Sequence, residues 1–177
     1  MVFSRQVVLG LGSNRGASPL IIQDAARELS LVLEGAALSP LFISEPLYVS
    51  DQAQYTNAAL LAGFSGSALD LLAICQEIEA RFGRDRSKEQ RWGERSLDID
   101  ILLFGDSIID EGARLQVPHP RLNERKFALL PLLNLLPEAL DPRTGKPFAD
   151  LYRALGSQGI YYADLAPYNR LNEETGV

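Results

Sequence analysis

Two kinds of hydrophobic pattern follow one another along the chain, and they predict strands and helices in turn. Stretches that are continuously apolar, or that alternate apolar with polar residues, are typical of strands: residues 5–12, 37–49, 55–64 and 96–104. Stretches with apolar residues at helical spacing are residues 18–33, 67–82 and 128–136. The first two helices each separate strands, so the first six elements are expected in the order β-α-β-β-α-β.

Local signals mark the ends of the two longer helices. Ser18 and Pro19 have the pattern of an N-cap followed by proline at the first helical position, and Gly35 stops this helix. Ser67 and Asp70 have the spacing of a capping box, which begins the second helix.

This order of elements predicts an α+β fold of the ferredoxin-like type, an antiparallel sheet with helices on one face, followed by extra C-terminal elements. No linker or internal repeat divides the chain. Residues 1–160 are therefore expected to form one domain, and residues 161–177 an irregular C-terminal tail. Because folds of this kind host many functions, the function must be argued from the site.

Composition narrows the possible functions. Of the 177 residues, 46% are hydrophobic and 23% are charged, which is typical of a globular domain. One cysteine and one histidine exclude an internal disulfide, a cysteine zinc cluster and a multi-histidine metal site. No apolar run reaches the ~20 residues that span a bilayer, and the first residues do not resemble a secretory signal. We therefore expect a cytoplasmic protein that binds no membrane. A monomer is also expected, although composition does not decide the oligomeric state.

Charge is distributed unevenly. The net charge of −6 argues against a general nucleic-acid partner. Residues 81–95, the basic island, nevertheless contain six Lys or Arg against three acids. A basic island in an acidic chain indicates either a specific anionic ligand or a solvated loop, and charge alone does not separate the two.

The clearest candidate for chemistry is the pair Asp98 and Asp100 on an otherwise apolar strand. Side chains alternate between the faces of a strand, so both acids share one face, with Cα atoms ~6.7 Å apart. The apolar residues expected on the other face are Leu97, Ile99, Ile101 and Leu103. Two neighbouring carboxylates repel each other, and Mg²⁺ would relieve this repulsion. A solvated strand face, or pairing of the acids with nearby arginines, is the alternative.

Cations beside the two acids indicate phosphate chemistry. Arg84, Arg86, Arg91 and Arg95 supply planar donors suited to phosphate oxygens. Together with carboxylates that hold Mg²⁺, they would form the working parts of a phosphoryl-transfer site. Trp92 fits either core packing or stacking on a flat heterocycle. Neither the dinucleotide fingerprint nor a P-loop is present, so metal and arginines would have to hold the phosphates.

Further candidates lie on two other segments. His119 stands between two prolines and is either a surface or capping residue or a phosphate donor near the metal. Arg121 and Arg125 follow and would add positive charge. Tyr55 and Asn57 lie two apart on a strand and share a face, and the amide of Asn57 suits the edge of an amide-like heterocycle.

Four separated blocks cover most of residues 7–137. The longest, residues 91–105, reads RWGERSLDIDILLFG. The others are Leu11-Gly12-Ser13-Asn14, Tyr55-Thr56-Asn57-Ala58-Ala59, and Val117-Pro118-His119-Pro120-Arg121 with Arg125-Lys126-Phe127. These blocks and their order resemble the 6-hydroxymethyl-7,8-dihydropterin pyrophosphokinases, whose signature is R-W-G-x-R-x-L-D-[IL]-D-[IL]. Glu45 departs from the family pattern, in which proline often precedes the residue matching Pro46.

The resemblance implies an ATP-dependent diphosphotransferase of folate biosynthesis. Such an enzyme moves pyrophosphate from ATP to the hydroxymethyl group of 6-hydroxymethyl-7,8-dihydropterin and releases AMP. The resemblance implies two Mg²⁺ ions held by Asp98 and Asp100, with Arg84 and Arg95 as catalytic arginines. The implied ATP-binding residues are Glu79, Arg84, Lys88, Arg95, His119 and Arg125. The implied pterin-binding residues are Leu47, Tyr55, Asn57, Trp92 and Phe127.

Two other classes are compatible with parts of the pattern. A two-metal phosphohydrolase would use the same acids with water as acceptor, and would release phosphate or pyrophosphate from ATP without a pterin. A non-catalytic RNA-binding module of ferredoxin-like fold is disfavoured by the net charge of −6 and by the missing RNA-stacking aromatics.

Overall fold

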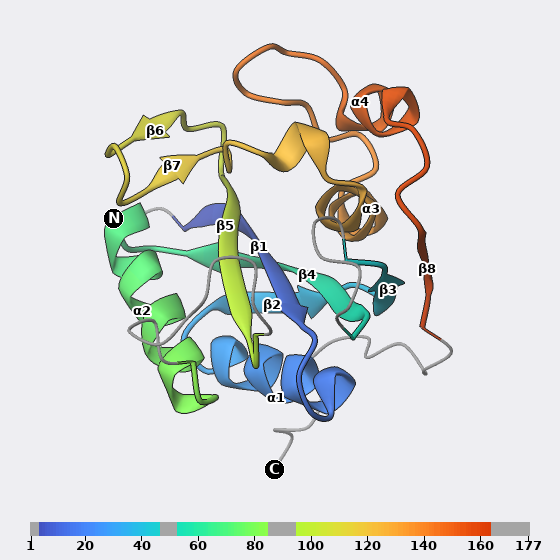
Figure 1. Ribbon diagram of the computed structural model, residues 1–177. Coiled ribbons are helices and arrows are strands. Elements are labelled where there is room, and N and C mark those ends of the chain that lie inside the picture. The colour runs from blue at the N-terminus through green and yellow to red at the C-terminus, as the bar shows by residue number, and fades with distance from the viewer. Residues whose placement is uncertain (1–3, 47–52, 85–94, 164–177) are drawn as a thin grey trace.

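The computed structural model describes residues 4–46, 53–84 and 95–163, which are built around a central antiparallel sheet (Figure 1). The strands of this sheet are β1 (Arg5–Ser13), β2 (Glu34–Leu38), β3 (Phe42–Ser44), β4 (Tyr55–Phe64), β5 (Asp98–Phe104) and β8 (Ile160–Tyr162). Their order is β5-β1-β4-β3-β8, and β2 also pairs with β4. The predicted α+β fold with an antiparallel sheet is confirmed.

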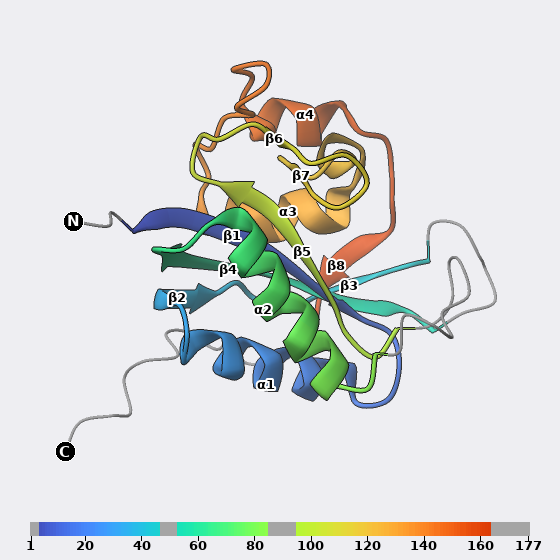
Figure 2. The ribbon, with the colours of Figure 1, turned by 90° about the vertical axis from the view of Figure 1, so that its left-hand side faces the viewer.

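Helices cover both faces of the sheet (Figure 2). They are α1 (Ser18–Ser30), α2 (Ala68–Arg81), α3 (Lys126–Leu135) and α4 (Phe148–Ala154). The first two pack on one face over a core that includes Leu9, Leu29 and Leu60. The last two pack on the opposite face over a second core that includes Leu129 and Phe148. The two helices of the predicted β-α-β-β-α-β unit therefore share one face as expected, and the extra C-terminal elements add a second apolar layer on the opposite face.

The starts of α1 and α2 follow from local chemistry. The hydroxyl of Ser67 accepts a hydrogen bond from the backbone N–H of Asp70 (3.2 Å), and the Asp70 carboxylate accepts one from the backbone N–H of Ser67 (2.9 Å). This confirms the predicted capping box. In α1, by contrast, Ala17 is the N-cap and Ser18 is the first helical residue. The hydroxyl of Ser18 instead receives a hydrogen bond from the Ser13 hydroxyl (3.0 Å), which ties the helix start to the end of β1.

The single strand expected over residues 37–49 is divided into β2 and β3. Pro40 lies between them and has no N–H with which to continue a ladder. The backbone N–H of Ser39 donates to the Ala59 carbonyl (2.9 Å), and the Ala59 N–H donates to the Ser39 hydroxyl (2.9 Å). These bonds hold the interruption against β4, so both short strands pair with the same neighbour.

A register shift between β1 and β5 alters one predicted face. Val8 lies opposite Leu103, but Leu9 lies opposite Ile101, so β5 has one extra residue at this point. Leu103 therefore joins the core under α3 and α4, whereas Ile101 stays in the core under α1 and α2. The prediction that the two residues share a face was wrong, because strict alternation cannot anticipate a bulge.

Several short elements carry too few positions to show a period in the sequence. They are β6 (Ile109–Asp110), β7 (Gln116–Val117), a 3-10 turn (Leu122–Glu124), α4 and β8. Tyr161 and Tyr162, expected in an irregular tail, instead pair with Ile43 and Phe42.

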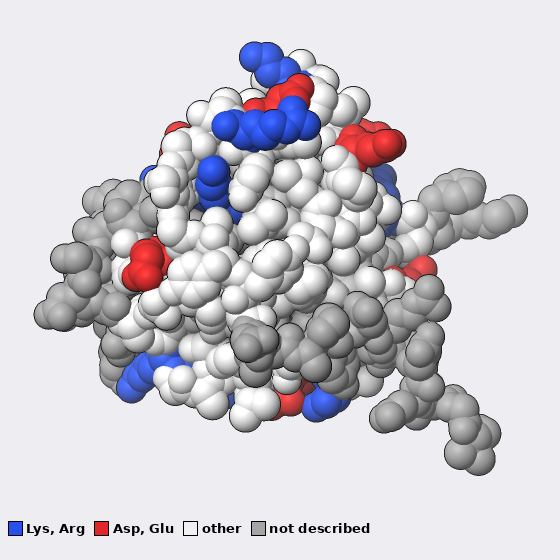
Figure 3. All heavy atoms as spheres, turned by 90° about the vertical axis from the view of Figure 1, so that its right-hand side faces the viewer, with Lys and Arg blue, Asp and Glu red and all other residues white. Residues whose placement is uncertain are grey.

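Figure 3 views the molecule from the side of α4 and β8, where most exposed atoms of the described residues belong to uncharged residues. Within the described ranges, no helix is both long and apolar enough to cross a membrane.

Cys75 provides a test of whether the core is intact. It is the single cysteine of the sequence, it is fully buried in α2, and this burial raises the pKa of its thiol far above the ordinary value. A colorimetric thiol reagent is expected to leave the native protein unmodified and to label one thiol per chain in denaturant. Labelling of the native protein as fast as that of a free thiol would contradict this packing.

Candidate functional site

The two acids of β5 lie beside a strip of β1 that carries no side chains. Asp98 is opposite Gly12 and Asp100 is opposite Gly10 across the β1–β5 ladder. A Cβ added at Gly10 would come within 3.2 Å of Leu102, and one added at Gly12 would lie 3.7 Å from the Asn57 Oδ1 atom. The two glycines therefore leave space above the sheet, which forms the floor of a pocket.

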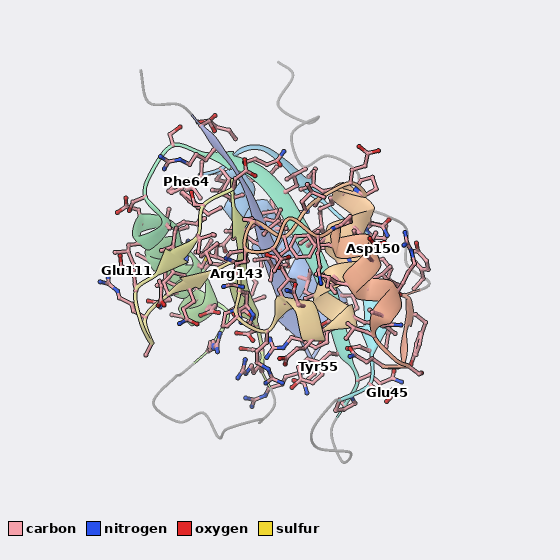
Figure 4. The ribbon with its side chains drawn as sticks, turned by 90° about the horizontal axis from the view of Figure 1, so that it is seen from above. Glu45, Tyr55, Phe64, Glu111, Arg143 and Asp150 are labelled. Carbon is pink, nitrogen blue, oxygen red and sulfur yellow. The ribbon has the colours of Figure 1, made fainter. Side chains whose placement is uncertain are left out.

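This pocket has a volume of about 150 Å³ and two walls. One, the β3–β4 wall, consists of Ser44, Glu45, Pro46, Tyr55 and Asn57. The other, the α3 wall, consists of His119, Arg125, Phe127 and Ala128. Asp98, Asp100 and Arg95 also line the cavity. Figure 4 shows Tyr55 and Glu45 at one end of the sheet, opposite the end that carries Phe64.

Asp98 is held by two guanidinium groups. Arg84 pairs with one oxygen of its carboxylate, and Arg95 pairs with the other. Burial raises the pKa of Asp98, but the charges of Arg95 and Arg84 outweigh this effect, so the pKa lies below its ordinary value. Asp98 is consequently ionised at neutral pH. Of the alternatives that the sequence left open for the two acids, pairing with nearby arginines is the one observed for Asp98.

An ion pair with Glu79 of α2 holds Arg84 in place. The Glu79 side chain is only 1% exposed and pairs with Arg84, whose side chain is 7% exposed. Glu79 also accepts a hydrogen bond from the backbone N–H of Ile99 (2.8 Å), so it joins α2 to β5 between the two acids. Glu79 is not among the residues that line the pocket, and it contacts Arg84, which pairs with Asp98.

Replacing Glu79 with glutamine is expected to lower the free energy of unfolding by about 3 kcal/mol, since it leaves a buried arginine with one fewer counter-charge. Urea unfolding at neutral pH measures this loss. Asp150→Asn is the matched control, because it breaks an ion pair with Arg153 whose side chains are 58% and 72% exposed. That change should cost less than about 0.5 kcal/mol. Equal losses in the two variants would contradict a buried anchor at Glu79.

Asp100 has a different environment. Its side chain is 38% exposed, and its carboxylate lies 3.7 Å from His119 Nε2 and 3.9 Å from an Arg125 nitrogen, both beyond hydrogen-bond distance. Burial and the neighbouring charge of Asp98 raise the pKa of Asp100 to about 7. The two acids therefore differ: the pKa of Asp98 lies below its ordinary value, whereas that of Asp100 is raised, so Asp100 ionises at a higher pH.

His119 turns a defined nitrogen toward Asp100. Its backbone N–H donates to the Leu102 carbonyl (3.1 Å), and its Nδ1 accepts from the backbone N–H of Arg121 (3.2 Å). Burial, together with the charge of Arg125, lowers the pKa of His119 to about 4, so the ring is neutral at pH 7. With Nδ1 acting as acceptor, the proton resides on Nε2, and His119 offers the pocket an N–H donor.

Two asparagines position other parts of the site. Asn57 is 4% exposed, and its Nδ2 donates to the Ser44 hydroxyl (2.9 Å), which fixes its amide on the β3–β4 wall. Asn14 accepts from the backbone N–H of Arg95 (2.8 Å) and donates its own backbone N–H to the Arg95 carbonyl (3.1 Å). The sequence reasoning missed Ser44, Asn14 and the glycine floor, although the alternating glycines of β1 were a readable signal.

The structure thus brings together most of the candidate residues. The pocket lining includes Tyr55, Asn57, Arg95, Asp98, Asp100, His119, Arg125 and Phe127. Arg84 reaches it through Asp98. Leu47, Lys88 and Trp92 lie outside the described residues. In the described part of the chain, no group of three or more acids, histidines or cysteines could hold a metal.

Comparison with known proteins points to one family. The family model for 7,8-dihydro-6-hydroxymethylpterin-pyrophosphokinase matches residues 8–137. The 2-amino-4-hydroxy-6-hydroxymethyldihydropteridine pyrophosphokinase of Pseudomonas aeruginosa is 39% identical over 158 residues, 88% of this chain and 95% of that protein. The Bacillus subtilis enzyme of the same name is 39% identical over 132 residues, 72% of this chain and 75% of that protein.

Solved structures share the fold. The wild-type HPPK-DHPS of Plasmodium falciparum with pteroate superposes with a TM-score of 0.68 at 16% identity, over 85% of this chain. This chain corresponds to 42% of that longer protein, so the likeness concerns one part of it.

Proposed function

The chain belongs to the 7,8-dihydro-6-hydroxymethylpterin-pyrophosphokinase family, and from this premise we propose how its residues transfer pyrophosphate from ATP to the hydroxymethyl group of 6-hydroxymethyl-7,8-dihydropterin. The chain is a pyrophosphokinase of folate synthesis. The observation that carries the residue-level proposal is the joint placement of Asp98, Asp100, Arg95 and Asn57 around one pocket. Acids and arginines suit the triphosphate, and the amide suits the heterocycle.

The donor set at the two acids fits Mg²⁺. Magnesium usually takes one or two carboxylates and completes its shell with water and phosphate, so no third protein acid is needed. Burial and the charge of Asp98 raise the pKa of Asp100, and a dication would relieve the repulsion between the two acids. We therefore propose Asp98 and Asp100 as ligands of two Mg²⁺ ions, which when bound would neutralise the phosphates and polarise the reacting phosphorus.

Five cationic or donor side chains are proposed to hold the ATP, four of them in the described part of the chain. Arg84 and Arg95, now paired with Asp98, can exchange one carboxylate contact for phosphate oxygens of the same charge. The Arg125 Nε atom is buried and has no hydrogen-bond partner among the described residues, which supports an anionic ligand at this point. His119 would donate from Nε2 without adding charge. Glu79 supports Arg84, and Lys88 is proposed for the same side of the ATP.

The pterin is proposed to lie between the two walls. Asn57 would read the amide edge of the ring, while Tyr55 and Phe127 provide apolar contact from opposite walls. Leu47 and Trp92 are proposed as further contacts. Held this way, the hydroxymethyl oxygen faces the phosphates with little freedom, and this alignment supplies much of the rate in phosphoryl transfer.

The direct test is the formation of AMP from ATP, with and without 6-hydroxymethyl-7,8-dihydropterin and Mg²⁺. We expect AMP only when all components are present, with one pterin diphosphate formed per AMP. Release of phosphate or pyrophosphate without pterin would instead indicate the phosphohydrolase.

The proposal also covers the oligomeric state, the extent of the domain and the cellular location. We propose that the chain acts as a monomer in the cytoplasm, with one domain that extends through β8 to Tyr162. Light scattering on the purified protein should give a mass near 19.5 kDa, and a mass near twice that value would contradict it.

A further inference from the structure

The chain leading into β8 is bonded to the α3 wall, although it does not line the pocket. The side-chain oxygen of Gln158 accepts a hydrogen bond from the backbone N–H of Lys126 (2.8 Å), and its nitrogen donates to the backbone carbonyl of Glu124 (2.9 Å). These two backbone groups stand on either side of Arg125, directly before Phe127. Gln158 therefore fixes the start of α3, from which the α3 wall rises.

The same short segment is also bonded to the β3–β4 wall. The Gly159 carbonyl accepts from the backbone N–H of Glu45 (3.1 Å). The Tyr161 hydroxyl donates to the Glu45 carboxylate (3.3 Å) and accepts from the Gln54 side chain (2.5 Å), which in turn donates to Glu45 (2.8 Å). Glu45 follows β3 and Gln54 precedes β4. The three hydrogen-bonded side chains of Glu45, Gln54 and Tyr161 therefore connect the end of β3 with the start of β4, the two strands of the β3–β4 wall.

These contacts explain two features of the sequence, the glycine at position 159 and the acid at position 45. Gly159 has a φ of +51°, and a Cβ there would lie 3.1 Å from the Glu45 Cγ atom, so glycine permits the close approach. Glu45 supplies the carboxylate that accepts from both Gln54 and Tyr161. A side chain without an acceptor atom, such as that of proline, could not accept these bonds.

We propose that residues 158–161 form a brace that sets the spacing of the two pocket walls, with Gln158 and Tyr161 as positioning residues for the pterin. The β3–β4 wall carries Tyr55 and Asn57, and the α3 wall carries Phe127. A link between the walls therefore fixes the width of the slot that a flat heterocycle must fill. This inference rests on the proposed function, because it takes those three residues as the pterin contacts.

The test is calorimetric titration of the full chain with 6-hydroxymethyl-7,8-dihydropterin, in the presence of a non-hydrolysable Mg–ATP analogue. Gln158→Ala removes both bonds to the α3 wall and is expected to raise the pterin Kd about tenfold. Tyr161→Phe is expected to raise it about threefold. Tyr162→Phe is the matched control on the same strand, because the Tyr162 ring packs against Phe42 and keeps that contact without its hydroxyl. Its Kd should stay within about twofold.

A swap of donor and acceptor makes the test specific. Gln54→Glu alone places two carboxylates together and is expected to raise the pterin Kd about tenfold. The double variant Glu45→Gln with Gln54→Glu restores one donor and one acceptor, and should recover affinity to within about threefold. The β3–β4 wall carries none of the arginines, so the Kd of the ATP analogue should change less than twofold in both.

Asn57→Ala separates the brace from the function on which it rests, because it removes a proposed contact and is expected to weaken pterin binding more than tenfold. If Asn57→Ala weakens pterin binding but the brace variants do not, the brace is wrong and the proposed function stands. If Asn57→Ala has no effect, the pterin contacts are wrong and the brace falls with them. Brace variants that lose only thermal stability, or lose both ligands equally, would also overturn the brace.

Discussion

Asp100→Asn is expected to abolish turnover and yet to leave the metal-free protein at least as stable as the wild type. The carboxylate is a proposed Mg²⁺ ligand, so its loss should reduce kcat on the order of 10³-fold or more. Its folded-state pKa of about 7 means that the native protein is reluctant to ionise it. Asparagine has nearly the same shape and no charge, so the free-energy cost of ionising residue 100 in the folded state is absent.

The sign of the pH effect follows from linkage. The ordinary pKa of the carboxyl is 3.8 and the folded pKa is raised to about 7, so between these values the folded state binds more protons than the unfolded state. The contribution of Asp100 to stability therefore falls as pH rises through this window. The measurement is the melting temperature of Asp100→Asn and of the wild type in buffer with a metal chelator. The advantage of the variant over the wild type should grow from pH 5 to pH 8.

Asp98→Asn is the matched comparison. Asp98 has a lowered pKa because it is paired with Arg84 and Arg95, and removing its charge leaves those arginines short of a partner. This variant should also lose activity, but it should melt below the wild type at pH 8. If both variants shifted stability in the same direction, the contrast between the two acids would be wrong.

Arg84→Ala is expected to lower kcat by about 10²–10⁴-fold while changing the pterin Kd little. A guanidinium that stabilises charge on transferring phosphate oxygens acts mainly in the transition state, so its loss appears in kcat. Steady-state kinetics and pterin titration measure the two effects separately. Arg81→Ala is the control, since Arg81 is the last residue of α2, three positions before Arg84, with its side chain 55% exposed and paired to Glu28. An unchanged kcat with weaker pterin binding would contradict the role given to Arg84.

Local patterns predicted the parts of the fold that local chemistry decides. The capping box at Ser67 and the strand at residues 55–64 were found because their signals lie within a few residues. The bulge that moves Leu103 to the other core depends on how β1 pairs with β5, and no single strand reveals it. The helix at residues 128–136 was predicted and corresponds to α3, but its packing on the opposite face together with the short α4 was not, because that layer depends on the core that the two helices complete.

The candidate site divides in the same way. Asp98 and Asp100 could be read from alternation on one strand, whereas His119, Arg125 and Asn57 were candidates with open alternatives until the resemblance implied their roles. The different states of the two acids could not be read, because they depend on which arginines fold against which carboxylate. Gln158 was also missed, since its partners lie more than thirty residues away in the sequence.

The most direct test of the central claim is a crystal structure with a non-hydrolysable ATP analogue, 6-hydroxymethyl-7,8-dihydropterin and Mn²⁺ in place of Mg²⁺, with anomalous diffraction to locate the ions. We predict two anomalous peaks, each roughly 2.0–2.3 Å from an oxygen of Asp98 or Asp100 and from phosphate oxygens. A complex with both ligands bound and no ion at either carboxylate would contradict the account.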